Sequence, residues 1–232
     1  AHIVTAKFWQ NVKENGLHLT VAETGWGKAS WGKIYGQWLC GCGVMVYDFD
    51  IFSPEKLLKV IEDFKVTSFC APPTVYRYFI KKDMKKFDLS HLEHITTAGE
   101  ALNPEVFEQV HKQTGLQIME GFGQTESVLM LGNLVGSTAK IGSLGKPTPL
   151  YNIMIADNEG NRLPANEVGE IVVIPSENQH GIFMGYCGNE DLYANVWKYG
   201  IYHTGDTAYM DDDGYYWYVG RIDDLIKTRG YR

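Results

Sequence analysis

The sequence predicts an α/β protein, with a parallel-sheet α/β subdomain followed by a small antiparallel β-barrel-like subdomain. Two observations support this fold class. In the first half, apolar strand-like runs alternate with amphipathic helix-like segments, which is typical of a parallel sheet with right-handed crossovers. In the second half, alternating strands are separated by turns rich in Asp and Gly, as in antiparallel hairpins. We therefore expect the first subdomain at residues 1–135 and the second at 136–223.

The first half contains several predicted strands with helices between them. The run at 44–47 is apolar and β-branched, and it predicts the first strand. Ser53 and Pro54 predict the start of a helix, because Ser can cap free N–H groups and proline fits the first helical position. Asn103 and Pro104 repeat this signal. The other strands are expected at 67–70, 94–98 and 117–119, and further helices at 75–82 and from 103 to about 115.

The second half is predicted to form strands that are separated by turns. Residues 151–155 alternate in polarity and precede turn residues at 157–160. A β-branched run follows at 170–174. Residues 211–214, with the sequence Asp-Asp-Asp-Gly, separate two aromatic-rich runs, as a hairpin turn would. This pattern therefore predicts a small antiparallel β unit.

Composition limits the kind of protein. Hydrophobic residues make up 44% of the 232 residues and charged residues 21%, which is ordinary for a soluble globular protein. The formal net charge of −7 argues against nucleic-acid binding, which needs a basic face. The longest apolar run, at about 38–47, is roughly half the length that spans a bilayer, so no membrane span is predicted. The four cysteines lack metal-ligand spacing and favour a reducing, cytoplasmic setting.

Two glycine-rich segments resemble common nucleotide motifs without matching them. The segment at 25–30 begins like a phosphate loop. However, its first Gly is too close to the Gly-Lys pair at 27–28, and no Ser or Thr directly follows Lys28. The segment at 121–126 begins like a dinucleotide fingerprint, but Glu126 stands where a third Gly must pack. The sequence therefore supports neither a Walker nucleotidase nor a Rossmann dehydrogenase.

The segments at 99–101 and 121–126 are expected to form a site, because ligands bind beyond the carboxyl ends of parallel strands. Glycines let the backbone come close to a ligand, and Phe122 offers a flat face for a purine. Thr125 can donate its hydroxyl to a phosphate oxygen, and Glu126 is a hard oxygen ligand suited to Mg²⁺. The alternative is a glycine-rich loop with an incidental acid at a helix start.

Three other sequence features can each be interpreted as part of a ligand site or as structural residues only. Asp206 can accept two hydrogen bonds from a ribose diol, or it can be a turn residue that bonds its own backbone. Arg221 and Arg232 can face a polyphosphate, or they can belong to a solvated mixed-charge surface. Trp26 and Trp31 can line the bottom of an apolar pocket, or they can be core residues.

Taken together, the motifs carry more information than any one alone. In order and spacing they resemble the core motifs of the adenylate-forming superfamily, which includes acyl-CoA synthetases, firefly luciferase and nonribosomal peptide adenylation domains. The resemblance runs essentially from end to end, and the segment at 24–32 is most similar to the medium-chain acyl-CoA synthetase branch. The matching segments are 97–102 (TAGEAL), 121–126 (GFGQTE), 202–206 (YHTGD), 220–224 (GRIDD) and 230–232 (GYR).

The resemblance implies a role for each matching residue. Thr125 and Glu126 are expected to serve catalysis, with Glu126 as the Mg²⁺ ligand. Asp206 is expected to hold the ribose hydroxyls beside Arg221. Residues expected around the adenine and phosphates are Gly99, Glu100, Ala101, Glu120, Gly121, Phe122, Gly123, Gln124, Thr125 and Arg232.

The resemblance also implies an acyl pocket and a hinge. Trp31 and Gly123 fall where the acid lies in the family. Acetyl-CoA synthetases carry a Trp at the position of Gly123, so a larger acid is expected here. Asp223 matches the hinge to a small C-terminal domain, which would begin within 224–232.

The implied activity is that of an AMP-forming acyl-CoA synthetase, an acid–thiol ligase. A carboxylic acid and ATP give an acyl-adenylate and pyrophosphate, and coenzyme A then displaces AMP. The family's phosphate loop with its Lys is expected upstream of Ala1, and the C-terminal domain with its Lys after Arg232. These parts are expected partners, so we predict that the 232-residue chain is inactive alone.

Other functions stay open at this point. An adenylation domain that loads a carrier protein usually has an early Asp in its pocket to hold an amino group, and nothing near 26–31 plays that part. An acetyl- or propionyl-CoA synthetase, a non-catalytic nucleotide-binding module and a plain structural domain are the remaining alternatives.

Overall fold

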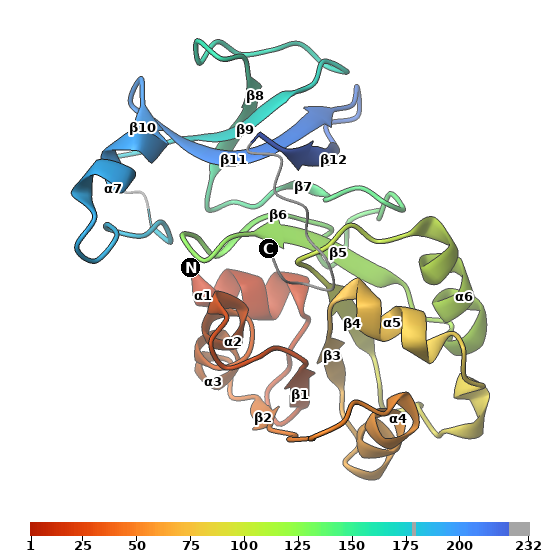
Figure 1. The fold of residues 1–232 in the computed structure, drawn as a ribbon. Helices are drawn as coiled ribbons and strands as arrows, with labels where there is room; N and C mark the ends of the chain where they lie inside the picture. The colour runs from red at the N-terminus through yellow and green to blue at the C-terminus, as the bar shows by residue number, and fades with distance from the viewer. Residues whose placement is uncertain (178–179, 223–232) are drawn as a thin grey trace.

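The computed structural model describes residues 1–177 and 180–222, which form two β-sheets, with helix α7 (Glu190–Val196) beside the second and the other helices around the first (Figure 1). The first sheet has seven strands in the order β2-β1-β3-β4-β5-β6-β7. The second runs β10-β11-β9-β8, with β12 paired to β11. The predicted fold class, an α/β part with a parallel sheet followed by an antiparallel part, is confirmed. The strands of the second part form an open sheet within the described residues, so the barrel-like closure is not found there.

The first sheet is parallel through β5 and antiparallel beyond it. Strand β5 runs on to Gly123, past the predicted end at 119, because its last residues pair with β6. Strand β1 has no sequence prediction, since His18 and Thr20 interrupt its apolar pattern. In order along the sheet the strands are β2 (Gly43–Met45), β1 (Leu17–Thr20), β3 (Ser68–Cys70), β4 (His94–Thr97), β5 (Ile118–Gly123), β6 (Leu129–Gly132) and β7 (Lys146–Pro147).

Helices α4 and α6, which connect parallel strands, begin where their capping residues predict, whereas α5 begins two residues before its predicted start at 75 and has no side-chain cap. The Ser53 hydroxyl accepts a hydrogen bond from the Lys56 N–H at 3.3 Å, and the Asn103 side chain accepts one from the Glu105 N–H at 2.8 Å. Gly115 ends the third of these helices with a φ of +76°, a conformation that suits glycine. These helices are α4 (Pro54–Asp63), α5 (Pro73–Phe79) and α6 (Pro104–Thr114), and a 3₁₀ turn, η2 (Met84–Lys86), lies between α5 and α6.

Two hydrophobic cores lie on the two faces of the first sheet. Helices α4, α5 and α6 pack on one face, while the N-terminal helices lie on the other (Figure 1). In the second core, Trp9 and Trp31 pack with Ile153 and Tyr202 of the second sheet, so this core joins the two sheets. The N-terminal helices are α1 (His2–Val4), the π-helix η1 (Thr5–Trp9), α2 (Gly27–Trp31) and α3 (Tyr35–Leu39).

The second sheet is antiparallel throughout. Residues 211–214 join β11 to β12 as the predicted turn, and Gly214 has a φ of +81°. Strand β7 lies within 136–223 by sequence but pairs with β6 in the first sheet. The elements of this part are β8 (Asn152–Ala156), β9 (Gly169–Ile174), α7 (Glu190–Val196), β10 (Trp197–Lys198), β11 (Ile201–Met210) and β12 (Tyr216–Arg221).

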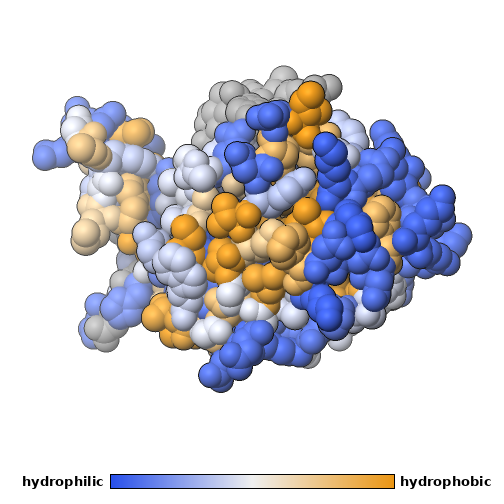
Figure 2. Space-filling model, turned by 90° about the horizontal axis from the view of Figure 1, so that it is seen from below, coloured by the Kyte–Doolittle hydropathy of each residue, from blue (hydrophilic) through white to orange (hydrophobic). Residues whose placement is uncertain are grey.

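The surface carries some large exposed apolar side chains. Figure 2 shows hydrophobic side chains gathered on the underside of the molecule, flanked by hydrophilic ones. Trp38 and Leu39 of α3, and Val46 and Ile51 beyond β2, are among the exposed apolar residues. Within the described residues, every helix is too short or too polar to cross a membrane.

Candidate functional site

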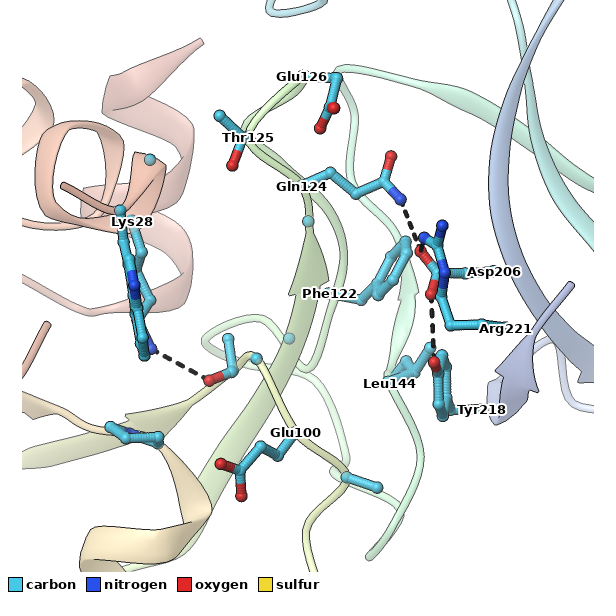
Figure 3. Close-up of a pocket in the computed structure, with 18 of the residues that line it drawn as sticks. Lys28, Glu100, Phe122, Gln124, Thr125, Glu126, Leu144, Asp206, Tyr218 and Arg221 are labelled. Carbon is cyan, nitrogen blue, oxygen red and sulfur yellow. Dashed lines mark hydrogen bonds and ion pairs between the residues drawn. The ribbon is translucent and has the colours of Figure 1, made fainter. Parts of the chain in front are cut away.

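A cavity of about 820 Å³ lies between the carboxyl edge of the first sheet and the second sheet. Figure 3 shows how its walls come from segments that are far apart in the sequence. Helix α2 and the loop after β4 form one side, the end of β5 runs across the middle, and β11 and β12 form the other side. The chain therefore places a large cavity where open α/β sheets bind ligands.

The two loops singled out from the sequence meet at this cavity. Strands β4 and β5 are parallel neighbours, so the residues that follow them lie at the same edge of the sheet. Gly99 has a φ of +101°, which a side chain would strain, and it lets the loop turn sharply after β4. Residues 99–101 and 121–126 all line the cavity.

Glu100 is anchored by side chains of helix α5. Its carboxylate accepts a hydrogen bond from the Thr74 hydroxyl at 2.9 Å and pairs with the Arg77 guanidinium at 2.9 Å. These contacts fix the loop after β4 to the first two turns of α5. Glu100 therefore has a structural task in addition to its place on the cavity wall.

Asp206 is the most completely held carboxylate at the cavity, with 2% of its surface exposed. Its Oδ2 accepts hydrogen bonds from the Gln124 amide at 2.6 Å and from Arg221 Nη1 at 3.3 Å. Its Oδ1 accepts one from the Tyr218 hydroxyl at 3.2 Å. Side chains therefore orient this carboxylate, unlike a turn Asp that bonds its own backbone. Four lone-pair positions and three donors leave room for one more donor from a ligand.

Gln124 connects the two sheets at this point. Its amide nitrogen also donates to the Thr204 carbonyl at 2.8 Å, and its amide oxygen accepts from the Tyr202 hydroxyl at 2.8 Å. Gly205 between Thr204 and Asp206 has a φ of +70°, and a Cβ there would lie 3.1 Å from Arg221 Nη2. The turn before Asp206 therefore needs glycine for both conformation and space.

Thr125 and Glu126 follow Gln124 at the rim of the cavity. The Thr125 side chain is exposed, and Glu126 is half-buried and accepts a hydrogen bond from the Tyr186 hydroxyl at 3.0 Å. The described residues contain no group of three or more His, Cys, Asp or Glu placed to hold a metal ion. A single carboxylate still fits Mg²⁺, which proteins usually bind through one or two carboxylates together with substrate phosphates and water.

Glu120 lies behind the cavity and does not line it. It is 2% exposed, its Oε1 accepts a hydrogen bond from the Leu102 N–H at 3.1 Å, and its Oε2 has no partner among the described residues. Burial raises the pKa of this carboxyl to about 8, so it is mostly uncharged at neutral pH. Its contact with Leu102 supports the loop at 99–101 from behind.

Lys28 is a cavity residue that the sequence reasoning missed. It lies on α2 with 8% of its surface exposed, and its Nζ donates to the Ala98 carbonyl at 3.1 Å (Figure 3). Burial lowers the pKa of its amino group. The sequence feature that could have indicated this role is the position of the Lys between Trp26 and Trp31, in a segment that does not match a phosphate loop. Tyr218, Leu144 and Pro72 also line the cavity without having been predicted.

The structure thus brings most of the predicted site residues to one cavity. Arg232 and the hinge residue Asp223 lie outside the described residues. Glu120 supports the cavity from behind, and Trp31 lines it with 6% of its surface exposed. The predicted residues on the cavity wall are Trp31, Gly99, Glu100, Ala101, Gly121, Phe122, Gly123, Gln124, Thr125, Glu126, Asp206 and Arg221.

Comparison with protein families and curated proteins gives strong matches. The family described as "AMP-binding enzyme" matches residues 7–187. The mouse acyl-coenzyme A synthetase ACSM3, mitochondrial, is 39% identical over 99% of this chain and 40% of its own length. The human acyl-coenzyme A synthetase ACSM4, mitochondrial, is 39% identical over 97% of this chain and 39% of its own. The 4-hydroxybutyrate–CoA ligase 1 of Metallosphaera sedula is 40% identical over 95% and 39%.

Solved structures match the fold closely. The anthranilate CoA ligase AuaEII in complex with anthranoyl-AMP has a TM-score of 0.87 and 28% identity, over 98% of this chain and 43% of that chain. The Brucella canis acyl-CoA synthetase has a TM-score of 0.85 and 27% identity, over 99% and 43%. The chain therefore spans about 40% of the length of the curated relatives it matches.

Proposed function

This chain belongs to the AMP-binding enzyme family, and we propose that it forms the nucleotide-binding part of an ATP-dependent acyl-CoA synthetase. The reaction joins a carboxylic acid to coenzyme A and converts ATP to AMP and pyrophosphate. One observation carries the proposal: the buried, oriented carboxylate of Asp206 and the glycine-rich segment at 121–126 face the same cavity. A bound adenylate needs both an acceptor for a ribose hydroxyl and a backbone that lets its phosphate approach.

In the first half-reaction, a carboxylate oxygen of the acid attacks the α-phosphorus of ATP and pyrophosphate leaves in line. The acid is already ionised at neutral pH, so the step needs no general base. Catalysis then depends on positioning and on cations that offset the charge on the phosphates. The Thr125 hydroxyl donates to a phosphate oxygen, and Arg221 supplies a cation beside Asp206. Mg²⁺, held by Glu126, would neutralise polyphosphate charge when bound.

In the second half-reaction, the thiol sulfur of coenzyme A attacks the acyl carbon. The bond between that carbon and the phosphate oxygen breaks, and AMP leaves with the electron pair. The adenylate keeps its contacts with Asp206 and Phe122 through both steps. The protein therefore needs one nucleotide site for two reactions, and no covalent link to the enzyme is involved.

The names of the relatives support coenzyme A as the acceptor in preference to a carrier protein. Those described above are called acyl-coenzyme A synthetases or CoA ligases. Anthranilate and 4-hydroxybutyrate, which two of these names contain, are larger acids than acetate. The larger acids agree with Gly123, because the family resemblance implies a Trp at this position in acetyl-CoA synthetases.

The test is acid-dependent exchange of pyrophosphate into ATP by the full-length protein. We expect exchange with a four- to eight-carbon or aromatic acid, at a higher kcat/KM than with acetate. Addition of coenzyme A is expected to give a thioester, while a carrier protein gives none. The proposal is wrong if no acid in a broad panel supports exchange, and the acceptor is wrong if only a carrier protein is loaded.

The cytoplasmic localisation predicted from the cysteines stays a prediction. The names of two relatives place those proteins in mitochondria. Fractionation of cells that express the tagged full-length protein tests which compartment holds it.

A further inference from the structure

Lys28 presents a buried amino group at the cavity. Helix α2 carries it, and 8% of its surface is exposed. Its one hydrogen-bond acceptor among the described residues is the Ala98 carbonyl, at 3.1 Å. A lysine ammonium has three donors, so the contact with Ala98 leaves two of them without a protein acceptor in this part of the chain.

The amino group also lacks a counter-ion in the described ranges 1–177 and 180–222. The salt bridges there do not include Lys28, whereas the more exposed Lys140 pairs with both Asp211 and Asp213. Desolvation lowers the pKa of Lys28, and the nearby Cys70 and Glu100 oppose that shift in part. Burying donors without acceptors costs free energy, so a ligand that supplies an acceptor gains from this site.

Lys28 lies at the end of the cavity opposite to Asp206. Figure 3 shows Lys28 on one side of the end of β5, with Asp206, Tyr218 and Arg221 on the other. If the ribose lies at Asp206, as the proposed function requires, the acid lies toward Lys28. Trp31, which is on the same helix and also lines the cavity, has an indole N–H without an acceptor among the described residues. This end of the cavity therefore has hydrogen-bond donors on Lys28 and Trp31.

We propose that Lys28 is a specificity-determining residue and that the acid carries a second oxygen, distant from the reacting carboxylate, which accepts a hydrogen bond from Lys28 Nζ. The inference rests on the proposed function. A plain alkyl chain covers the amino group without offering it an acceptor. A site that is built to hydrogen-bond a substrate group discriminates strongly against an analogue that lacks the group, because its own polar atoms are then left unpaired.

The first experiment uses the full-length wild-type protein and pairs of acids with equal numbers of heavy atoms. Pentanoate is compared with 4-hydroxybutyrate, and heptanoate with 6-hydroxyhexanoate, in pyrophosphate exchange. Glutarate and adipate form a further arm, in which the second oxygen is charged. We expect at least one oxygen-bearing acid to exceed its alkyl partner in kcat/KM by about tenfold or more, as for one hydrogen bond to a charged group. Preference for the alkyl acid throughout overturns the inference.

The second experiment uses Lys28→Met, which keeps the length of the side chain and removes the donors. We expect the ratio of kcat/KM for the oxygen-bearing acid to kcat/KM for its alkyl partner to fall about tenfold or more in this variant. Lys33→Met is the matched control, since Lys33 is also buried, at 9% exposure, but does not line the cavity. An unchanged ratio in Lys28→Met overturns the inference. If that variant does not fold, the wild-type comparison decides.

The two proposals fail in different ways. If the wild-type protein exchanges pyrophosphate with no acid, the proposed function is wrong. If exchange occurs but favours alkyl acids, or Lys28→Met and Lys33→Met behave alike, only the role of Lys28 is wrong.

Discussion

Among single residues, Asp206 is the one on which nucleotide affinity is expected to depend most. Asp206→Ala removes the ribose acceptor and leaves Gln124 and Tyr218 with one partner fewer. We expect the variant to bind ATP and AMP more weakly by about 1.5–3 kcal/mol, from the loss of one charge-assisted hydrogen bond to a ribose hydroxyl in a buried site. Isothermal titration of the full-length protein measures this, with Asp212→Ala, an exposed turn residue, as control. Unchanged affinity for ATP and AMP would mean that Asp206 is a structural turn residue and does not bind the ribose.

Glu126 is expected to matter in one half-reaction more than in the other. Glu126→Gln keeps the shape of the side chain and its contact with Tyr186 but removes the charge that Mg²⁺ needs. Adenylation is expected to slow strongly, and thioester formation from supplied acyl-adenylate much less, because no pyrophosphate is displaced in that step. Single-turnover measurements of the two steps test this. Equal loss in both would mean that Glu126 serves the structure.

Glu120 gives the fold a dependence on pH. Burial raises its pKa from 4.5 to about 8, so the folded protein holds a proton that the unfolded chain releases at lower pH. The stability that Glu120 contributes is therefore fully present below about pH 4.5, falls as pH rises to about 8, and is constant above that. Glu120→Gln stays uncharged, so its stability relative to wild type is expected to grow over this range by a few kcal/mol.

Denaturant unfolding at the two ends of that pH range tests the role of Glu120. Glu159→Gln is the control. Glu159 is exposed in a turn, so this substitution removes a carboxylate without changing the interior. A stability difference between wild type and Glu120→Gln that stays constant with pH would mean that Glu120 is ionised in the folded protein.

Within the elements, the pairing of β5 with β6 depends on Gly123. A Cβ at this position would lie 2.5 Å from the Val128 carbonyl oxygen, which is backbone and cannot turn aside. Gly123→Ala is therefore expected to destabilise the protein by about 1–3 kcal/mol, as other overpacked sites do. Thermal unfolding measures it. Gly25→Ala is the control, since a Cβ there meets nothing within 4 Å. Equal melting temperatures would show that the two strands adjust freely.

Gly123 also illustrates what the sequence could not predict. Its interpretation as room for a larger acid came from a family resemblance, whereas its contact with Val128 depends on a register shift in the β5–β6 pair. Strand β1 was missed because His18 and Thr20 are polar. Both are buried, and His18 is hydrogen-bonded to Thr20 and to Ser68 of the next strand. Such partners are distant in sequence and leave no local pattern.

Elements with local causes were predicted well. The starts of α4 and α6 follow from Ser53 and Asn103, whose side chains cap the backbone within three residues. The cavity is different, because its contacts join distant segments. Gln124 meets Asp206 across 82 residues, and Lys28 meets Ala98 across 70. Motif order identified Asp206 and Gln124, but a lysine in an unfamiliar segment gave no reason to expect burial.

For the whole molecule, the 232-residue chain alone is expected to form no acyl-CoA. The chain spans about 40% of the length of the curated relatives it matches, and the phosphate loop and catalytic Lys that the family resemblance implies have no counterpart among these residues. Weak AMP binding is expected to persist, because Asp206, Phe122 and the loop at 99–101 are present. Thioester formation by the purified chain, or titration that gives affinity tighter than micromolar, would contradict this expectation.

The Gln124 amide ties the two sheets together at the place where the nucleotide is proposed to bind. Its hydrogen bonds to Thr204 and Asp206 form only while the sheets are in contact. A ligand that touches both the 121–126 segment and Asp206 must bind the joined arrangement better than a separated one. Bound nucleotide therefore lowers the population of molecules in which the sheets have parted, and proteases that cleave parted molecules should act more slowly in its presence.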